Sequence, residues 1–178
     1  MSLSVQETPA NPLREIKIEK VVVNIATGKS GEPLEKAKKV LNQMTEKTPA
    51  TKRAKKAIKD FGVRKGEPIS AVVTLRGKEA GEFLRRALDA VSNKVNMTSF
   101  DEYGNFSFGI KEHIEVPGTR YVPELGIFGA TIHVTLSRPG YRVRSRAIRP
   151  AKIGRGHYVS REEAVTFMQS NFGTNVAS

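Results

Sequence analysis

Lysine and arginine side chains crowd two separate segments of this chain, and phosphate binding is the chemistry that such crowding suits. The first segment, TKRAKKAIKDFGVRKGEP, covers residues 51–68 and also holds apolar residues. Between Lys52 and Lys65 it carries a single acid, Asp60, against seven cations: Lys52, Arg53, Lys55, Lys56, Lys59, Arg64 and Lys65. A cation that neutralises a phosphate releases condensed counterion, so the cluster predicts strong, salt-sensitive binding to a polyanion.

The second segment is rich in arginine and has no acid from Leu125 to Arg161. Between Tyr141 and Arg146 arginine occupies every second position, which in an extended chain places three guanidinium groups on one side. The planar guanidinium binds phosphate oxygens bidentately. Glycine and proline interrupt both segments, so we interpret them as binding surfaces and not as merely solubilising charge. The cations of the second segment are Arg138, Arg142, Arg144, Arg146, Arg149, Lys152, Arg155 and Arg161.

Residues that could support catalysis are present, but their spacing is wrong. TGKSGEP, residues 27–33, contains Gly-Lys-Ser, yet a P-loop needs a further glycine where Val23 stands. We therefore predict a glycine-rich turn whose Lys29 contacts RNA backbone. The three histidines have no carboxylate at catalytic or metal-binding spacing. His133 could contact RNA from the polar face of its strand, although a surface histidine with no role is the favoured alternative. The sequence predicts no enzyme, no cofactor and no metal site; the histidines are His113, His133 and His157.

The composition favours a nucleic-acid partner. The chain has 178 residues, a formal net charge of +12 and no cysteine, which excludes disulfides and cysteine-ligated zinc. An excess charge of this size opposes compaction unless nucleic acid, an anionic membrane or an acidic protein relieves it. The polar start, MSLSVQETPANP, and apolar runs as short as Val21–Val23 predict a cytoplasmic chain with no membrane partner.

RNA fits this charge better than DNA or a membrane surface. TKRAKKAIKDF has too few apolar residues for an amphipathic membrane helix. No basic zipper, zinc finger or helix-turn-helix pattern occurs, so sequence-specific DNA reading has little support. Separated basic patches on loops can follow a folded RNA, which proteins recognise largely through shape, sugar hydroxyls and phosphates.

Hydrophobic periodicity predicts the elements that carry these patches. Strands are predicted where apolar residues alternate or are β-branched: IKIEKVVVNIAT from Ile16, Ile69–Arg76, NFSFGIK and ATIHVTLS. One helix is predicted from Pro33, with Leu34, Ala37, Val40, Leu41 and Met44 on its apolar face. A second is predicted over KEAGEFLRRALDAVSNKV, with an apolar face of Leu84, Leu88, Val91 and Val95. A capping box of Ser160 and Glu163 begins a last helix, which Gly173 ends.

These elements predict an α+β fold: a two-layer sandwich of a mainly antiparallel sheet with helices on one face. Residues 1–12 are predicted as a flexible tail and residues 13–137 as the RNA-binding core, with a protruding basic loop at 49–68. Residues 138–178 are predicted as an arginine-rich extension and a C-terminal helix.

Five long stretches resemble one known family. They are VVVNIATGKSGE, TPATKRAKKAIKDFGVRKGEPI, AVVTLRG, SFDEYGNFSFGIKEH and SRPGYRVR with HYVSREEAVTFMQSNFG. Together they are similar to the 5S-rRNA-binding large-subunit ribosomal protein family (protein L-five), of the archaeal and eukaryotic type. The resemblance covers roughly residues 12–173.

The resemblance implies a structural constituent of the large ribosomal subunit that attaches 5S rRNA in the central protuberance. The sheet and nearby strand ends would meet 5S rRNA, with matching positions at Asn24 and Thr74, and the arginine-rich extension would lie on large-subunit rRNA. Without an RNA contact, Asn24 would be a turn former at a strand end and Thr74 would reflect strand propensity alone. The predicted rRNA-binding residues are Asn24, Lys29, Thr74, Arg76, Arg138, Arg142, Arg144, Arg146, Arg149, Lys152 and Arg155.

The resemblance also assigns roles to two loops. The basic loop would approach the elbow of peptidyl-site tRNA, with Ile58, Phe61 and Val63 anchoring its base to the sheet. Residues 117–129 would bridge to a protein of the small-subunit head, although local packing of their apolar side chains is the favoured alternative. Neighbouring large-subunit proteins are further expected partners. The predicted tRNA-binding residues are Lys52, Arg53, Lys55, Lys56, Arg64 and Lys65.

Two other hypotheses stay open from the sequence. An RNA-binding module or RNA chaperone acting outside the ribosome would carry the same charges without a fixed place in a particle. A nucleotide hydrolase with a degenerate P-loop ranks third.

Overall fold

The computed structural model describes residues 11–177, and most of them fold around one five-stranded sheet. The strand order is β2-β3-β1-β6-β5, and every neighbouring pair in this sheet is antiparallel. A second, parallel pair joins β4 to β7. In chain order the elements are β1 (Lys17–Ala26), α1 (Glu32–Thr45), β2 (Ala50–Arg53), β3 (Pro68–Leu75), α2 (Gly77–Ala90), β4 (Lys94–Asn96), β5 (Phe106–Ile110), β6 (Ala130–Ser137), α3 (Arg161–Phe172) and β7 (Asn175–Ala177).

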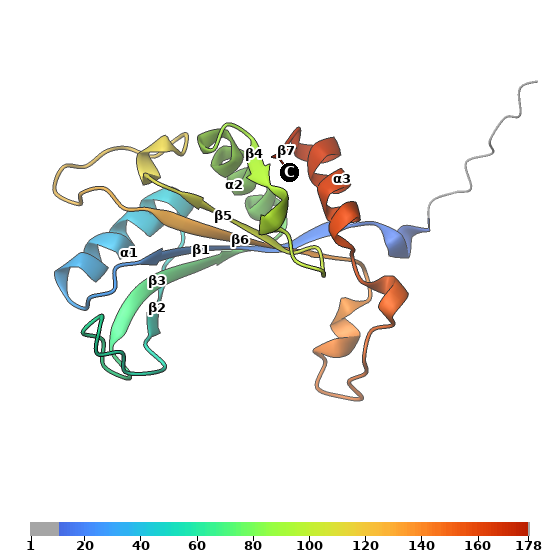
Figure 1. The fold of residues 1–178 in the computed structure, drawn as a ribbon, viewed down its shortest axis with the longest axis horizontal. Helices are drawn as coiled ribbons and strands as arrows, with labels where there is room; N and C mark the ends of the chain where they lie inside the picture. Colours follow the sequence, from blue (N-terminus) through green and yellow to red (C-terminus); the bar gives the residue numbers. More distant parts are fainter. Residues whose placement is uncertain (1–10, 178) are drawn as a thin grey trace, which may run out of the picture.

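The three α-helices lie on one face of the sheet, and the other face is left without a helix (Figure 1). Alternation along the strands sets this asymmetry, because successive side chains point to opposite faces. In β1, Val21, Val23 and Ile25 are fully buried under the helices, whereas Val22 and Asn24 are only partly buried on the other face. The predicted α+β sandwich is confirmed.

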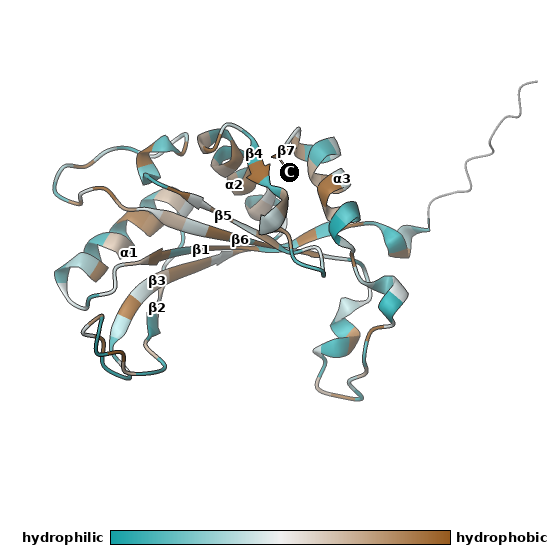
Figure 2. Ribbon diagram, viewed as in Figure 1, coloured by the Kyte–Doolittle hydropathy of each residue, from teal (hydrophilic) through white to brown (hydrophobic). Residues whose placement is uncertain are grey.

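The helices bury the apolar faces that their sequences predict. All five residues of the predicted apolar face of α1 are buried, and Glu32 and Glu35 complement the helix dipole in its first turn. In α2, Phe83, Leu84 and Leu88 are buried in the same core. Figure 2 shows hydrophobic residues in brown along the central strands of the sheet. The helices cover one face of these strands.

The capping box of α3 forms as predicted. The Ser160 hydroxyl accepts a hydrogen bond from the Glu163 backbone amide, and the Glu163 carboxylate accepts one from the Ser160 amide. Gly173 ends the helix with a φ of 62°, a left-handed conformation that costs glycine little. Ala164 and Met168 of α3 are buried in the common core.

The second helix is shorter at its C-terminal end than the sequence predicted. α2 ends at Ala90, because Ser92 and Asn93 adopt left-handed φ values of 54° and 56° and turn the chain. Val95 is therefore not a helical residue; it is buried in β4, which pairs with the C-terminal strand β7. The short strands β2, β4 and β7 have no predicted counterpart.

The described part of the chain contains neither a membrane-spanning helix nor a cluster of metal-binding residues. Among residues 11–177, no helix is both long and apolar enough to cross a membrane. The same residues contain no group of three or more histidines, cysteines or acids placed to hold a metal ion. The predicted tail falls mainly on residues 1–10, which lie outside the described part.

Candidate nucleic-acid interface

The uncovered face of the sheet presents short polar side chains from neighbouring strands. The register places Thr74, Val22 and His133 in one row across β3, β1 and β6. The adjacent row contains Asn24 and Thr131. Thr74 and His133 are exposed, whereas Asn24 and Thr131 are half-buried. The structure thus brings the predicted residues Asn24 and Thr74 onto the same helix-free face.

Several polar residues of this face were not singled out from the sequence. According to the strand register, Asn24 shares this face with Thr131 and Thr135 of β6, Ser107 of β5 and Lys20 of β1. The alternation within β6 indicated that its threonines point away from the core, but it could not show which strands lie beside β6. Together these hydroxyl, amide and ammonium groups can hydrogen-bond to sugar hydroxyls and phosphates without steric conflict.

The predicted loop at 49–68 is shorter in the structure, because Ala50–Arg53 form strand β2 and Pro68 begins β3. The remaining residues, 54–67, form the basic loop, which projects from the β2–β3 end of the sheet and is folded internally. Ile58 and Val63 exchange two backbone hydrogen bonds, at 2.9 and 3.1 Å, and form a small hairpin around residues 59–62. At the base of the loop, Ala54 donates to the Glu67 carbonyl at 2.8 Å and accepts from the Gly66 amide at 2.9 Å.

Glu67 ties the loop to the turn between β1 and α1. Its carboxylate accepts hydrogen bonds from the Arg64 backbone amide at 3.0 Å and from the Ser30 hydroxyl at 2.7 Å. These two bonds, the Arg64 amide first, hold the pKa of Glu67 below its usual value of 4.5. One of the two acids in the loop is thus engaged in the loop's own structure.

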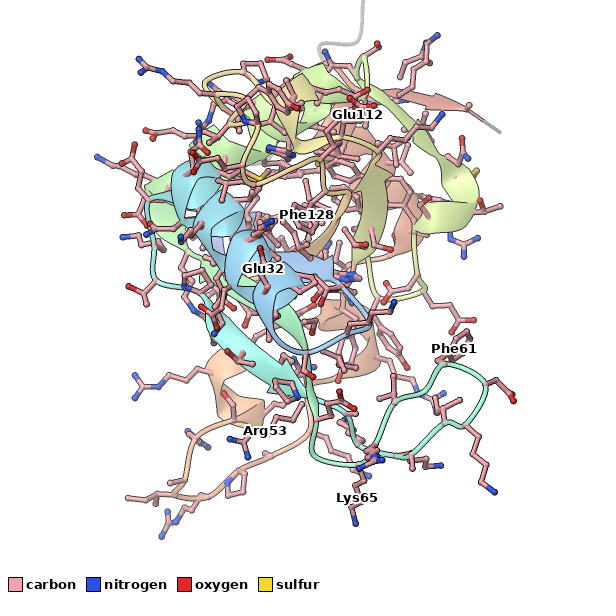
Figure 3. All side chains as sticks on the ribbon, turned by 90° about the vertical axis from the view of Figure 1, so that its left-hand side faces the viewer. Glu32, Arg53, Phe61, Lys65, Glu112 and Phe128 are labelled. Carbon is pink, nitrogen blue, oxygen red and sulfur yellow. The ribbon has the colours of Figure 1, made fainter. Side chains whose placement is uncertain are left out.

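The six predicted tRNA-binding cations are all exposed on β2 and the basic loop. In Figure 3, Lys65 points away from the body of the molecule, and Arg53 lies on the same lower side. The predicted apolar anchors are only partly correct, since Val63 is buried but Ile58 and Phe61 are 44% and 76% exposed. The hairpin carries Phe61 to the free end of the loop, where it does not pack into the core.

The arginine-rich extension, residues 138–158, is compact and not extended. Tyr141–Arg144 and Arg155–His157 form short 3₁₀ helices. Arginines at every second position therefore do not align on one side of a strand, contrary to the geometry of an extended chain. Six predicted cations are nevertheless exposed: Arg142, Arg144, Arg146, Arg149, Lys152 and Arg155.

Tyr141 holds the base of this extension. Its hydroxyl donates to the His157 carbonyl at 3.2 Å and accepts from the Val159 amide at 3.0 Å. Burial raises the pKa of Tyr141 above its usual value of 10.0. His157 bonds the Pro139 carbonyl through Nε2 at 2.8 Å. The exposed cations are thus mounted on an ordered support.

Arg138 differs from the other arginines of the extension. It is only 6% exposed, and its Nη2 donates to the Glu163 carboxylate at 2.6 Å. Its Nη1 donates to the Tyr158 carbonyl at 3.4 Å. Arg138 therefore connects β6 to α3 inside the protein, and we leave it out of the candidate interface.

The remaining two predicted rRNA-binding residues lie at opposite ends of the sheet. Lys29 is exposed in the β1–α1 turn and lines a cavity together with Lys55 and Lys56 of the basic loop. Arg76 is exposed just after β3, at the other end of that strand from the loop.

The basic loop and the arginine-rich extension project on the side of the sheet that faces away from the helices (Figure 1). They leave from opposite ends of the sheet, so the uncovered face lies between two exposed basic projections. The helix layer on the other side carries many of the acids, for example Glu32, Glu79 and Glu82. This separation of charge gives the molecule one side suited to a polyanion.

The segment 117–129 lies beside the end of β5, and two hydrogen bonds join it to His113. The buried His113 donates its backbone amide to the Phe128 carbonyl at 2.9 Å and accepts the Phe128 amide at Nδ1 at 3.3 Å. Burial lowers the pKa of His113 below its usual value of 6.5. Leu125 and Phe128 pack against the core, whereas Tyr121 and Ile127 are about half exposed.

Comparison with known proteins gives consistent matches along the chain. Residues 11–64 match the family model described as "Ribosomal protein L5", and residues 68–167 match the model of the C-terminal part of the same ribosomal family. Proteins named "Large ribosomal subunit protein uL5" are similar over nearly the whole length. The one from Sulfurisphaera tokodaii is 51% identical over 93% of this chain and 94% of its own. Those from Pyrobaculum aerophilum and Nitrosopumilus maritimus are 53% and 46% identical, covering 93% and 96% of this chain and 93% and 99% of their own.

Proposed function

The chain belongs to the ribosomal protein L5 family, and we propose from this premise that it attaches 5S rRNA to the large ribosomal subunit in the cytoplasm. Membership confirms the resemblance drawn from the sequence, including its archaeal and eukaryotic type, since the relatives above are archaeal. It also confirms that the chain is not an enzyme.

One observation carries the 5S rRNA proposal: a helix-free sheet face bearing Asn24 and Thr74 lies between two exposed basic projections. In this arrangement the projections neutralise phosphates and fix the register of the RNA, while the polar side chains on the sheet reach its sugars and base edges. An RNA of irregular shape suits such a two-armed surface better than a straight duplex does. The central protuberance, which the resemblance to the family implies, is the proposed place of this contact.

The basic loop is proposed to contact peptidyl-site tRNA, and the arginine-rich extension to contact large-subunit rRNA. Six exposed cations on β2 and the loop support the first contact, and six on the extension support the second. Because the loop is held by Glu67 and its own hairpin, its backbone loses little freedom on binding.

The segment 117–129 is proposed to bridge to a protein of the small-subunit head. The exposed side chains of Tyr121 and Ile127 support a protein contact, and the His113–Phe128 hydrogen bonds hold them in place. Leu125 and Phe128 pack locally, which is the alternative role that the sequence allowed for the apolar residues of this segment.

Sedimentation of cell extracts tests the ribosomal role. Comigration of the protein with large subunits after a high-salt wash is the expected result, because the polar contacts of a defined site persist when salt weakens the phosphate contacts. Recovery only in free fractions would instead favour an RNA-binding module or chaperone acting outside the ribosome. Labelled ATP or GTP should not be hydrolysed, since the P-loop glycine is absent.

A further inference from the structure

A cavity of about 630 Å³ lies between the basic loop and the turn that follows β1. Its size falls in the range of roughly 300–1,000 Å³ that is usual for small-ligand pockets. Ile58, Phe61 and Val63 of the loop hairpin contribute apolar side chains to its wall. No aspartate or glutamate is among the described residues that line it.

Two of the apolar side chains that line the cavity, those of Ile58 and Phe61, are exposed to solvent. Phe61 is 76% exposed, and Figure 3 shows it on the outer part of the projecting loop. The hairpin hydrogen bonds between Ile58 and Val63 fix the backbone on both sides of it. The ring is therefore presented by an ordered turn, a placement that suits a contact surface.

Charge complementarity indicates what covers this surface. Lys29, Lys55 and Lys56 line the same cavity, so three ammonium groups border an apolar wall. A nucleotide has this combination of an apolar, stackable base and a flanking phosphate on each side. Aromatic side chains between cations are how single-stranded RNA is commonly held, and stacking tolerates any base.

We propose that this cavity captures one unpaired nucleobase of the RNA that lies on the basic loop. The base stacks on Phe61 against the apolar wall, and the three lysines contact the phosphates on either side. The inference rests on the proposed function, because it requires the loop to lie on RNA, and it adds a base-binding role to a loop otherwise assigned only phosphate contacts. An apolar, acidic peptide segment is the rival occupant.

Two short RNA hairpins that differ at one position provide the probe. One carries a single unpaired adenosine replaced by fluorescent 2-aminopurine, and the other carries an abasic ribose at the same place. The full chain should bind the first about tenfold more tightly, with a change in its fluorescence, because one base–aromatic stack has about this effect. Phe61→Ala should bind both hairpins equally and keep the salt dependence of wild type, whereas Phe61→Trp should retain the difference.

Ile148→Ala is the matched control, since Ile148 is 80% exposed on the other basic projection and should leave the difference intact. Equal affinity of wild type for the two hairpins, with normal 5S rRNA binding, would overturn the inference and leave the proposed function standing. A difference that survives Phe61→Ala would overturn it as well. Absence of 5S rRNA binding by the folded wild type would overturn the proposed function, whereas absence of binding to either hairpin would overturn the inference. Binding of an acidic apolar peptide that Phe61→Ala abolishes, without any difference between the hairpins, would assign the cavity to a protein.

Discussion

Replacing Glu163 by alanine should destabilise the fold by removing the partner of a buried charge. Arg138 is 6% exposed and its guanidinium is paired with the Glu163 carboxylate at 2.6 Å, so the variant leaves an uncompensated buried cation. Breaking a fully buried pair costs about 3–5 kcal/mol. Because the Glu163 side chain is 44% exposed, water takes over part of the interaction, and we expect a loss of about 2–3 kcal/mol.

Part of that loss belongs to the helix cap and can be measured separately. Ser160→Ala removes the cap hydrogen bond but keeps the ion pair, and should cost about 1 kcal/mol. Glu162→Ala removes an exposed acid of the same turn and should cost less than that. Urea unfolding at neutral pH, followed by circular dichroism, gives the free energy of unfolding of each variant.

The ion pair also predicts a pH dependence with a definite sign. Burial alone would raise the pKa of Glu163, but hydrogen bonds from the Ser160 amide and the Arg138 guanidinium lower it below 4.5. The stabilisation is therefore complete above pH 4.5 and is lost as the pH falls through the lower folded-state pKa. If Glu163→Ala costs no more than Ser160→Ala, or if its loss persists unchanged in strong acid, Arg138 is not a buried charge that depends on this partner.

The interface and His113 give three more expected outcomes. Asn24→Ala should weaken 5S rRNA binding by about 1 kcal/mol, roughly fivefold in a filter-binding assay, because it removes one hydrogen bond to RNA. Lys52→Ala with Lys55→Ala should make the salt dependence of tRNA binding shallower by about 0.7–0.9 in log–log slope for each lost phosphate contact. Because the folded-state pKa of His113 lies below 6.5, its contribution to stability is complete above pH 6.5 and is lost as the pH falls below that value. Thermal unfolding measured from above pH 6.5 to more acidic pH should show this loss of stability in wild type and not in His113→Gln.

Matched controls come from the helix layer. Asn42→Ala removes an exposed amide from α1 and should leave 5S rRNA affinity unchanged, so an equal loss there would remove Asn24 from the interface. Lys39→Ala with Lys78→Ala removes two exposed cations of α1 and α2 and should not alter the slope. An unchanged slope in the double variant of the basic loop would show that its lysines are ordinary solvated residues.

The sequence predicted those features that local periodicity determines. Alternation in β1 and β6 gave both strands and their buried faces, and the apolar spacing of α1 gave its sheet-facing side. The motif of Ser160 and Glu163 gave the start of α3. These signals are local, so no knowledge of the tertiary fold was needed.

Features that depend on contacts between distant residues could not be predicted in this way. β4 forms only because Lys94–Asn96 pairs with Asn175–Ala177, which lies far along the chain. The spacing of Val91 and Val95 is that of a helix, but the left-handed residues Ser92 and Asn93 turn the chain between them. Arg138 looks like the other arginines of its segment, since only the fold places Glu163 beside it. Phe61 looks like a core residue until the hairpin carries it into solvent.

The most direct test of this account is the binding of purified, folded protein to a 5S rRNA transcript, measured against an unrelated folded RNA of similar length in dilute buffer. The account predicts that the protein binds 5S rRNA more tightly than the unrelated RNA, because the uncovered sheet face recognises 5S rRNA while the basic projections bind any phosphate backbone. It also predicts that Asn24→Ala reduces this difference in affinity. Equal binding of the two RNAs, or no binding of 5S rRNA by the folded chain, would contradict it.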